Sequence, residues 1–210
     1  MTIGTIISLN IGQTKNISDE DEKQIDSAIY KHSVSDTSLY LSTTNLEGDE
    51  QADLVNHGGS DKAVCVYPFE HYSYWENKFG FDLPIGAFGE NITLRGVPES
   101  KVFIGDTWQW GEAIVQVSQP RRPCFKVAKR HGIKKLPLYI QETGFSGYYL
   151  RVVKEGNVSG KDPFSLLNRM SDVSIEHVNR ITFYDKENYE EIKKLLNLKE
   201  LSEAWKASLK

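Results

Sequence analysis

The chain has 210 residues, with 25 Lys and Arg against 29 Asp and Glu, a formal charge of −4 and 39% hydrophobic residues. A chain of this size and composition buries enough surface to fold without disulfides or structural metals, which excludes fibrous, disordered and mini-protein classes. No apolar run approaches the roughly 20 residues that span a bilayer, and the first residues lack the basic segment of a secretory signal. Two cysteines and a mild negative charge fit a globular cytoplasmic protein that binds neither membrane nor nucleic acid.

The first part of the chain predicts a β-rich domain. Short β-branched or aromatic runs recur between glycine turns, as is typical of strands. The runs at 107–110 and 113–117 flank Gly111-Glu112, which predicts a hairpin with a tight turn. Many short strands with glycine turns indicate a barrel or a sandwich. The expected strands are 3–9, 39–42, 63–67, 107–110, 113–117 and 148–154.

Three short helices are expected as inserts in this β-rich part. Each begins at a proline and is followed by a glycine, residues that favour the start and the end of a helix. In the second helix the last turn carries Lys129, Arg130 and His131, which suits the negative end of the helix dipole. The expected helices are 68–79, 123–131 and 137–143.

The composition changes near residue 164. All 16 glycines lie at or before Gly160, and all 7 prolines lie at or before Pro163. Glycine and proline are the strongest local breaks in regular structure, so their loss indicates a different kind of domain. We therefore predict a first domain at 1–164 and a second at 165–210.

The second domain is predicted to be helical. Ser174, Asn188 and Ser202 are the expected N-caps of three helices. Helices of about ten residues are unstable alone in water, so these must pack on each other or on the first domain. We interpret the domain as a structural or docking appendage.

The most informative stretch is Ser118-Gln119-Pro120-Arg121-Arg122-Pro123-Cys124, which leaves a strand and enters a helix. With Pro123 as the first helical residue, Cys124 falls in the first turn, where the helix dipole and the two arginines favour a thiolate. We expect the pKa of this thiol to lie below its usual value of about 8.5. A thiolate serves as nucleophile, redox centre or soft-metal ligand. The alternative is a small buried hydrophobic residue, which is the expected role of Cys65 within an apolar strand.

A second stretch, 48–62, is long, polar and loop-like, and such loops often carry function. His57-Gly58-Gly59 lets the backbone approach a ligand closely, and Lys62 suits a phosphate. The alternative is a glycine turn with solvated charges. Gly89-Glu90-Asn91 is a similar but weaker case.

A set of cations near these loops is a possible anion site. One charge-assisted hydrogen bond contributes only about 1.5–3 kcal/mol, so a single exposed arginine binds nothing specific. Several converging cations would hold an anionic cofactor, but the sequence does not say whether they converge. The set is Lys31, Lys62, Arg121 and Arg151.

Other chemistries lack their motifs. The chain has no Cys-x-x-Cys pair and no His-Glu-x-x-His for zinc. It also lacks the Gly-x-Ser-x-Gly elbow of hydrolases and the Gly-Lys-Ser/Thr loop of nucleotide-binding proteins. Zinc enzymes, serine hydrolases and nucleoside triphosphatases are therefore disfavoured.

Taken together and in order, these stretches resemble the MOSC-domain superfamily, specifically its YiiM-like branch. The resemblance covers nearly the whole chain, and the tail is similar to the three-helix domain of this branch. The residues that carry it include Ser27-Ala28-Ile29-Tyr30-Lys31, Gly48-Asp49-Glu50-Gln51-Ala52-Asp53, His57-Gly58-Gly59, Asp61-Lys62-Ala63-Val64, Phe88-Gly89-Glu90-Asn91, Ser118-Gln119-Pro120-Arg121, Pro123-Cys124 and Tyr149-Leu150-Arg151-Val152.

The resemblance implies a mainly β (α+β) fold, a MOSC-type β-barrel with short helical inserts followed by a small three-helix domain. It also implies that the barrel binds a molybdenum cofactor (molybdopterin), with the thiolate of Cys124 as a metal ligand, a soft donor for such a centre. Asp61 would be an orienting acid or a structural turn residue, and Arg122 stands where a neutral residue is common. The residues expected to hold the cofactor are Lys31, His57, Gly58, Gly59, Lys62, Asn91, Arg121, Arg122 and Arg151.

For activity, the resemblance implies an oxidoreductase that reduces N-hydroxylated compounds, including hydroxylaminopurine bases, to amines. Its electrons would come from a separate flavin-dependent reductase. Two alternatives stay open at this point. In one, Cys124 carries a persulfide for sulfur transfer; in the other, the protein binds the cofactor without turnover.

Overall fold

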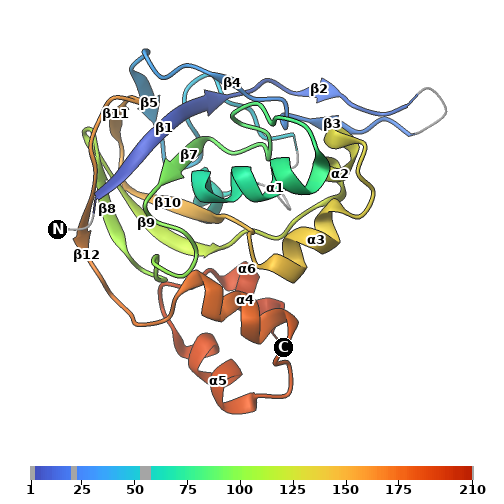
Figure 1. The fold of residues 1–210 in the computed structure, drawn as a ribbon. Coiled ribbons are helices and arrows are strands. Elements are labelled where there is room, and N and C mark those ends of the chain that lie inside the picture. Colours follow the sequence, from blue (N-terminus) through green and yellow to red (C-terminus); the bar gives the residue numbers. More distant parts are fainter. Residues whose placement is uncertain (1–2, 20–22, 53–57, 210) are drawn as a thin grey trace.

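The computed structural model describes residues 3–19, 23–52 and 58–209, and its centre is a closed β-barrel (Figure 1). Seven strands follow one another around the barrel in the order β12–β8–β9–β10–β6–β7–β1, and β1 closes the ring on β12. Closure leaves no unpaired sheet edge between them. The strands are β1 (Ile3–Ile11), β6 (Val64–Pro68), β7 (Ile92–Arg95), β8 (Thr107–Trp110), β9 (Ala113–Pro120), β10 (Tyr148–Lys154) and β12 (Phe164–Asn168).

All neighbouring pairs in the barrel are antiparallel except β6 and β7, which pair in parallel. A parallel pair needs a long crossover. Here the crossover contains the 3₁₀ turn η2 (Phe69–His71) and helix α1 (Tyr72–Phe79). The expected β-rich domain with helical inserts is thus confirmed, and it is a barrel rather than a sandwich.

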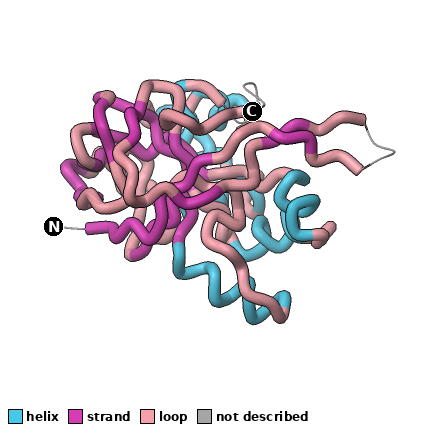
Figure 2. Tube along the Cα trace, turned by 90° about the horizontal axis from the view of Figure 1, so that it is seen from above, coloured by secondary structure: helices cyan, strands magenta, loops and turns pink. Residues whose placement is uncertain are grey.

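Short strands extend the barrel at its rim. β4 (His32–Ser33) adds to β1, and β5 (Leu39–Leu41) pairs with β11 (Gly156–Val158). β2 (Lys15–Asn16) and β3 (Asp26–Ser27) form a two-stranded arm that extends away from the barrel in both views (Figures 1 and 2). The chain returns from this arm directly into the cavity described below.

One hydrophobic core runs from the inside of the barrel into the C-terminal helices. Within the barrel Trp108, Trp110 and Phe164 are buried, and the rings of Trp108 and Phe164 stack with their centroids 5.0 Å apart. The same cluster includes Val178 and Trp205 of the C-terminal helices. The short terminal helices are therefore stabilised by packing on the barrel, as their length requires.

A second core lies under α1 and two further helices, α2 (Phe125–His131) and α3 (Leu136–Thr143). Tyr67 and Phe88 stack at its centre, 4.1 Å between ring centroids, and Trp75 Nε1 donates to the Tyr67 hydroxyl at 2.7 Å. Val127 of α2 belongs to this cluster. The packing fixes the helix that follows Cys124.

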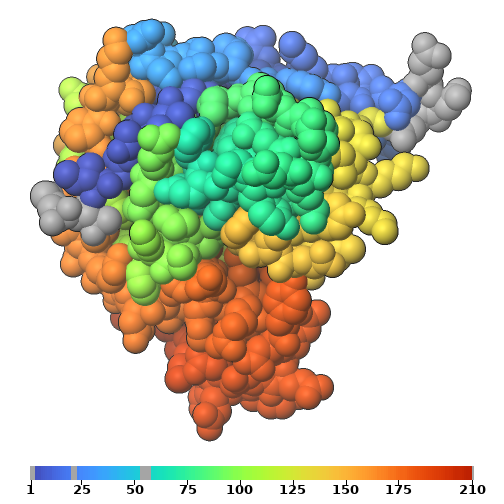
Figure 3. All heavy atoms as spheres, in the orientation of Figure 1, coloured from blue at the N-terminus to red at the C-terminus, as the bar shows by residue number. Residues whose placement is uncertain are grey.

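The C-terminal helices are α4 (Ile175–Phe183), α5 (Tyr189–Asn197) and α6 (Glu203–Ala207), and they cover one end of the barrel (Figures 1 and 3). The three predicted N-caps are confirmed: the side chains of Ser174, Asn188 and Ser202 each accept a hydrogen bond from the backbone three residues on. The division at residue 164 stays a prediction.

The expected helix at 123–131 begins later than predicted. It starts at Phe125, so Cys124 is its N-cap with extended backbone angles and is not in its first turn. Within the described part of the chain, none of the helices has both the length and the apolar character needed to cross a bilayer.

Candidate functional site

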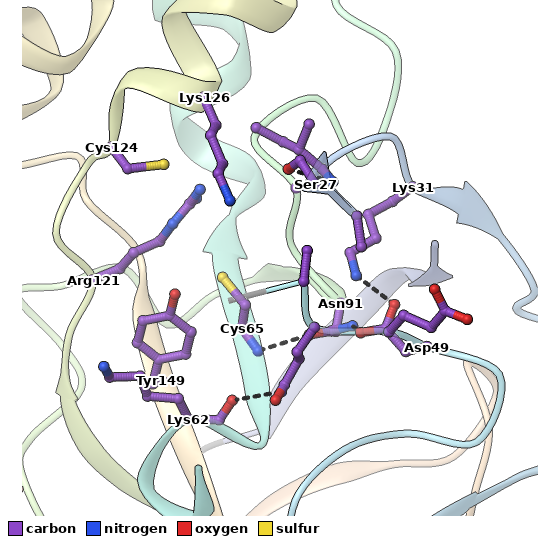
Figure 4. A pocket seen from close by; sticks show the side chains of 16 residues that line it. Ser27, Lys31, Asp49, Lys62, Cys65, Asn91, Arg121, Cys124, Lys126 and Tyr149 are labelled. Carbon is purple, nitrogen blue, oxygen red and sulfur yellow. Dashed lines mark hydrogen bonds and ion pairs between the residues drawn. The ribbon is translucent and has the colours of Figure 1, made fainter. Parts of the chain in front are cut away.

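A cavity opens between the barrel wall, helix α2 and the segment that returns from the β2–β3 arm (Figure 4). About 600 Å³ of non-atom space lies inside it, part of which is open to solvent. Its lining comprises Ser27, Ala28, Ile29, Lys31, Asp49, Glu50, Gln51, Ala52, Lys62, Cys65, Gly89, Asn91, Arg121, Cys124, Lys126 and Tyr149.

Cys124 is half-buried and lines this cavity. Its sulfur points inward from the start of α2 (Figure 4). Glycine at the other end of the helix, Gly132, adopts the left-handed conformation and ends it after seven residues. The cysteine is thus presented on a short helix that the second core holds in place.

Cys65 is buried in β6, as predicted, but it also lines the cavity, which the sequence did not indicate. Its backbone N–H donates to Asn91 Oδ1 at 3.0 Å. Burial raises the pKa of the Cys65 thiol to about 11, although the nearby Arg121 guanidinium lowers it in part. Cys65 is therefore a neutral thiol near pH 7, in the same cavity as the half-buried Cys124.

The cavity carries an excess of positive charge although the whole chain is negative. Among the described residues, four cations line it against two carboxylates, a local balance of +2 compared with −4 for the chain. Such a local excess favours an anionic ligand. The cations are Lys31, Lys62, Arg121 and Lys126, and the carboxylates are Asp49 and Glu50.

Arg121 is buried and fixed in the cavity wall. Its Nη2 donates to the carbonyl oxygen of Phe88 at 2.5 Å. Burial lowers the pKa of this guanidinium, but the neighbouring Cys65, Tyr149 and other acidic groups raise it more, so the net pKa is raised. Arg121 is a permanent cation with five N–H donors, and its contacts with Phe88 and the Tyr149 hydroxyl leave donors for a ligand.

Lys31, Asp49 and Asn91 form a buried network at the floor of the cavity. Lys31 Nζ forms an ion pair with Asp49 Oδ1, and both side chains are almost fully buried. Asn91 Nδ2 donates to Asp49 Oδ2 at 2.8 Å, and the Gly12 N–H donates to Oδ1 at 2.7 Å. Asp49 therefore neutralises Lys31 and orients Asn91.

Lys126 and Tyr149 are cavity residues that the sequence analysis missed. Lys126 Nζ donates to the carbonyl oxygen of Asp26 at 2.9 Å, which links α2 to the arm. Burial raises the pKa of Tyr149, so its hydroxyl stays protonated and can donate a hydrogen bond. Lys126 comes two residues after Cys124, and that proximity was the available signal for it.

Several predicted site residues do not line the cavity. Arg151 Nε donates to Asp61 Oδ1 at 2.8 Å, so these two residues form a half-exposed ion pair with each other. Gly58 is buried, and Gly59, with φ +94°, precedes the turn η1 (Ser60–Lys62), but neither lines the cavity. His57 lies outside the described residues.

Arg122 is also directed away from the cavity. Its Nη2 donates to Ser208 Oγ at 2.5 Å, and its guanidinium lies over the Trp205 ring at 4.8 Å from the centroid. The predicted residues that the structure brings together around the cavity are Cys124, Lys31, Lys62, Asn91 and Arg121.

The donor set bears on what kind of metal site is possible. Among residues 3–19, 23–52 and 58–209, no group of three or more His, Cys, Asp or Glu side chains is placed to hold a metal ion. A metal at Cys124 would therefore need most of its ligands from a bound organic group, unlike a zinc site built wholly from protein.

Comparison with known proteins assigns the family. The model of the MOSC domain matches residues 53–165, and that of the YiiM-like 3-alpha helix domain matches residues 173–210. The uncharacterized protein YflK of Bacillus subtilis is 46% identical over 205 residues, covering 97% of this chain and 92% of YflK. A Gibberella moniliformis protein named reductase is 39% identical over 150 residues, which cover 70% of this chain but only 26% of that protein.

The fold comparison agrees with the sequence matches. The crystal structure of YiiM from Geobacillus stearothermophilus superimposes with a TM-score of 0.83 at 36% identity, covering 98% of this chain and 97% of that one. Both domains, their order and the barrel are shared. The chain therefore belongs to the MOSC-domain family, in its YiiM-like branch.

Proposed function

We propose that this protein is a molybdenum cofactor-dependent oxidoreductase that reduces N-hydroxylated compounds to amines, with Cys124 as a metal ligand. The observation that carries the proposal is the half-buried thiol of Cys124 in a cavity with a positive charge balance. The family and the relative named reductase support an oxidoreductase role.

The cavity suits such a cofactor in charge and donor chemistry. Molybdopterin is an anion with a phosphate and a dithiolene, so it needs cations, hydrogen-bond partners and a soft protein donor for the metal. Arginine forks suit phosphate, and thiolates suit soft or polarizable centres. The cavity offers Arg121 and Lys126 as cations and Cys124 as the thiol.

Individual residues have separate roles in holding this ligand. Arg121 presents unused N–H donors from a fixed position, because its contact with Phe88 immobilises it. Lys126 has three ammonium donors, of which the structure assigns one to Asp26. Lys62 lies at the edge of the cavity. Asn91 is oriented by Asp49 and offers a polar contact at the floor.

The bound cofactor would supply a two-electron redox centre, and the protein would supply its placement and charge. Reduction of R–NHOH to R–NH₂ and water breaks one N–O bond and consumes two electrons and two protons. A separate flavin-dependent reductase would provide the electrons. The hydroxyl of Tyr149, protonated at neutral pH, can donate a hydrogen bond to the bound group, and the ammonium of Lys126 would pair with negative charge on that group.

The test uses the full chain expressed in a host that makes the cofactor. We expect near-stoichiometric molybdenum in the wild type and amine formation from a hydroxylaminopurine with an artificial reductant. Cys124→Ser should lose both, whereas Cys65→Ser, which removes the other thiol of the same cavity, should keep the metal. Cyanide-releasable sulfur on Cys124 without molybdenum would replace the proposal with sulfur transfer, and bound cofactor without amine would replace it with cofactor storage.

A further inference from the structure

Arg121 and Arg122 are neighbours in sequence, but they contact opposite sides of the stretch that carries Cys124. Arg121 lines the cavity and is fixed to Phe88. Arg122 contacts helix α6 through the Ser208 hydroxyl and the face of the Trp205 ring. The second arginine therefore attaches the cysteine stretch to the C-terminal domain.

A second attachment lies four residues before Arg122, at the end of strand β9. The Ser202 N–H donates to the Ser118 carbonyl oxygen at 3.0 Å, and Ser202 Oγ donates to Gln119 Oε1 at 2.6 Å. The same hydroxyl accepts from the Trp205 N–H at 3.1 Å and so caps α6. Ser202 and Gln119 are both buried, which strengthens these bonds relative to exposed ones.

A third attachment comes from helix α4. Asn179 Nδ2 donates to Ser146 Oγ at 2.9 Å, and Ser146 Oγ donates to the Gly147 carbonyl oxygen at 2.8 Å. That carbonyl also accepts the backbone N–H of Arg121 at 3.0 Å. Helix α4 thus reaches the Arg121 backbone through Ser146 and Gly147.

The two supporting helices are themselves joined. Trp205 Nε1 of α6 donates to Thr182 Oγ1 of α4 at 3.2 Å, and Trp205 is 2% exposed. Within the described part of the chain, no side-chain hydrogen bond holds Cys124 itself, and its carbonyl oxygen accepts only the Val127 N–H at 3.2 Å. The position of the thiol therefore depends on the residues that flank it.

We propose that the C-terminal three-helix domain is a positioning element of the site, which holds Cys124 and Arg121 in place through Ser202, Arg122 and Asn179. This goes beyond the appendage predicted from the sequence. It rests on the proposed function only for the identity of the ligand. Amide hydrogen exchange in the ligand-free protein tests it separately, so its failure is distinguishable from failure of the cofactor assignment.

The experiment compares two variants of the full chain that each remove an N-cap from a C-terminal helix. Ser202→Ala uncaps α6 and Asn188→Ala uncaps α5, but of these two residues only Ser202 contacts the stretch before Cys124. We expect Ser202→Ala to speed exchange at residues 118–125 by about fivefold, the factor that one hydrogen bond contributes to a local opening equilibrium. Asn188→Ala should leave that segment unchanged.

The barrel strand β6 at 64–68 is the internal reference, because a general loss of stability would speed exchange there as well. A matched pair tests the arginine: Arg122→Ala should act on 118–125, whereas Arg95→Ala, which removes a similar stacking over Phe69, should not. The proposal would be overturned by equal exchange at 118–125 in Ser202→Ala and Asn188→Ala. It would also be overturned if Ser202→Ala sped exchange at 64–68 as much as at 118–125.

Discussion

The carboxylate of Asp49 accepts a hydrogen bond from the Asn91 side chain at 2.8 Å and joins two segments 42 residues apart beneath the cavity. The same carboxylate forms the buried ion pair with Lys31. Two side chains from separate parts of the chain, Lys31 and Asn91, are thus held by one acid. Neither its role nor its burial follows from the polar, loop-like sequence around it.

Replacing Asp49 by Asn should destabilise the fold strongly. The substitution leaves the Lys31 ammonium buried without a counter-charge, and breaking a buried pair in this way costs about 3–5 kcal/mol. The free energy of unfolding in urea measures the effect. Asp36→Asn is the control, because Asp36 pairs with Lys161 at 2.7 Å where both side chains are exposed. No measurable change is expected there, and a similar loss in both variants would contradict the assigned role.

The two thiols of the cavity should differ sharply in reactivity. Cys124 is half-exposed, whereas Cys65 is buried and its pKa is about 11. At pH 8 about one Cys65 in a thousand is then a thiolate, the reactive form. Iodoacetamide under native conditions should therefore label Cys124 and leave Cys65 unmodified, as peptide mass spectrometry can determine. Labelling of both at similar rates would show that Cys65 is not sheltered as described.

The elements whose stability is local were predictable from sequence. The N-caps at Ser174, Asn188 and Ser202 were found because a cap is a short-range hydrogen bond with a strong residue preference. Two barrel strands were missed. β7 (Ile92–Arg95) has only four residues, and β12 (Phe164–Asn168) lies where the composition changes. Their pairing with distant strands, not their local pattern, makes them strands.

The site was predictable only in part, because the local sequence does not show which side chains meet in the folded protein. The motif that contains Cys124 correctly predicted a thiol in the cavity, and Arg121 and Lys31 line the same cavity. Arg151 had the same charge but is occupied by Asp61. Arg122 follows Arg121 directly, yet successive side chains on extended backbone point to opposite sides, and this alternation was the available signal.

Stability should fall as the pH rises from 9 to 11. Burial raises the pKa of Cys65 from an ordinary 9.0 to about 11, so the folded protein keeps a proton that the unfolded chain releases across this window. The stabilisation is complete below pH 9, and up to about 2–3 kcal/mol is lost by pH 11. The urea midpoint measured at several pH values tests this.

The buried tyrosines add to the fall above pH 10, because burial raises the pKa of Tyr67, Tyr148 and Tyr149 in the same direction. Cys65→Ala separates the two contributions. It should make the decline between pH 9 and 11 shallower while leaving the steeper tyrosine part. An unchanged slope in this variant would mean that Cys65 does not keep its proton in the folded state.

Arg121 and Arg151 allow a direct test of which arginine holds the ligand. Arg121→Gln removes the fixed cation of the cavity wall, and loss of one charge-assisted contact of about 1.5–3 kcal/mol weakens binding about 10- to 150-fold. We therefore expect molybdenum to be lost from this variant on extended dialysis. Arg151→Gln removes the same charge from a side chain that contacts Asp61 and Gln116 outside the cavity, and should retain the metal. Arg121→Lys keeps the charge without the planar fork, so the molybdenum that it retains should lie between the amounts in the other two variants.

Thermal melting of each variant shows whether it is folded. Metal retained in Arg121→Gln but lost in Arg151→Gln would mean that the ligand lies on the other side of strand β10.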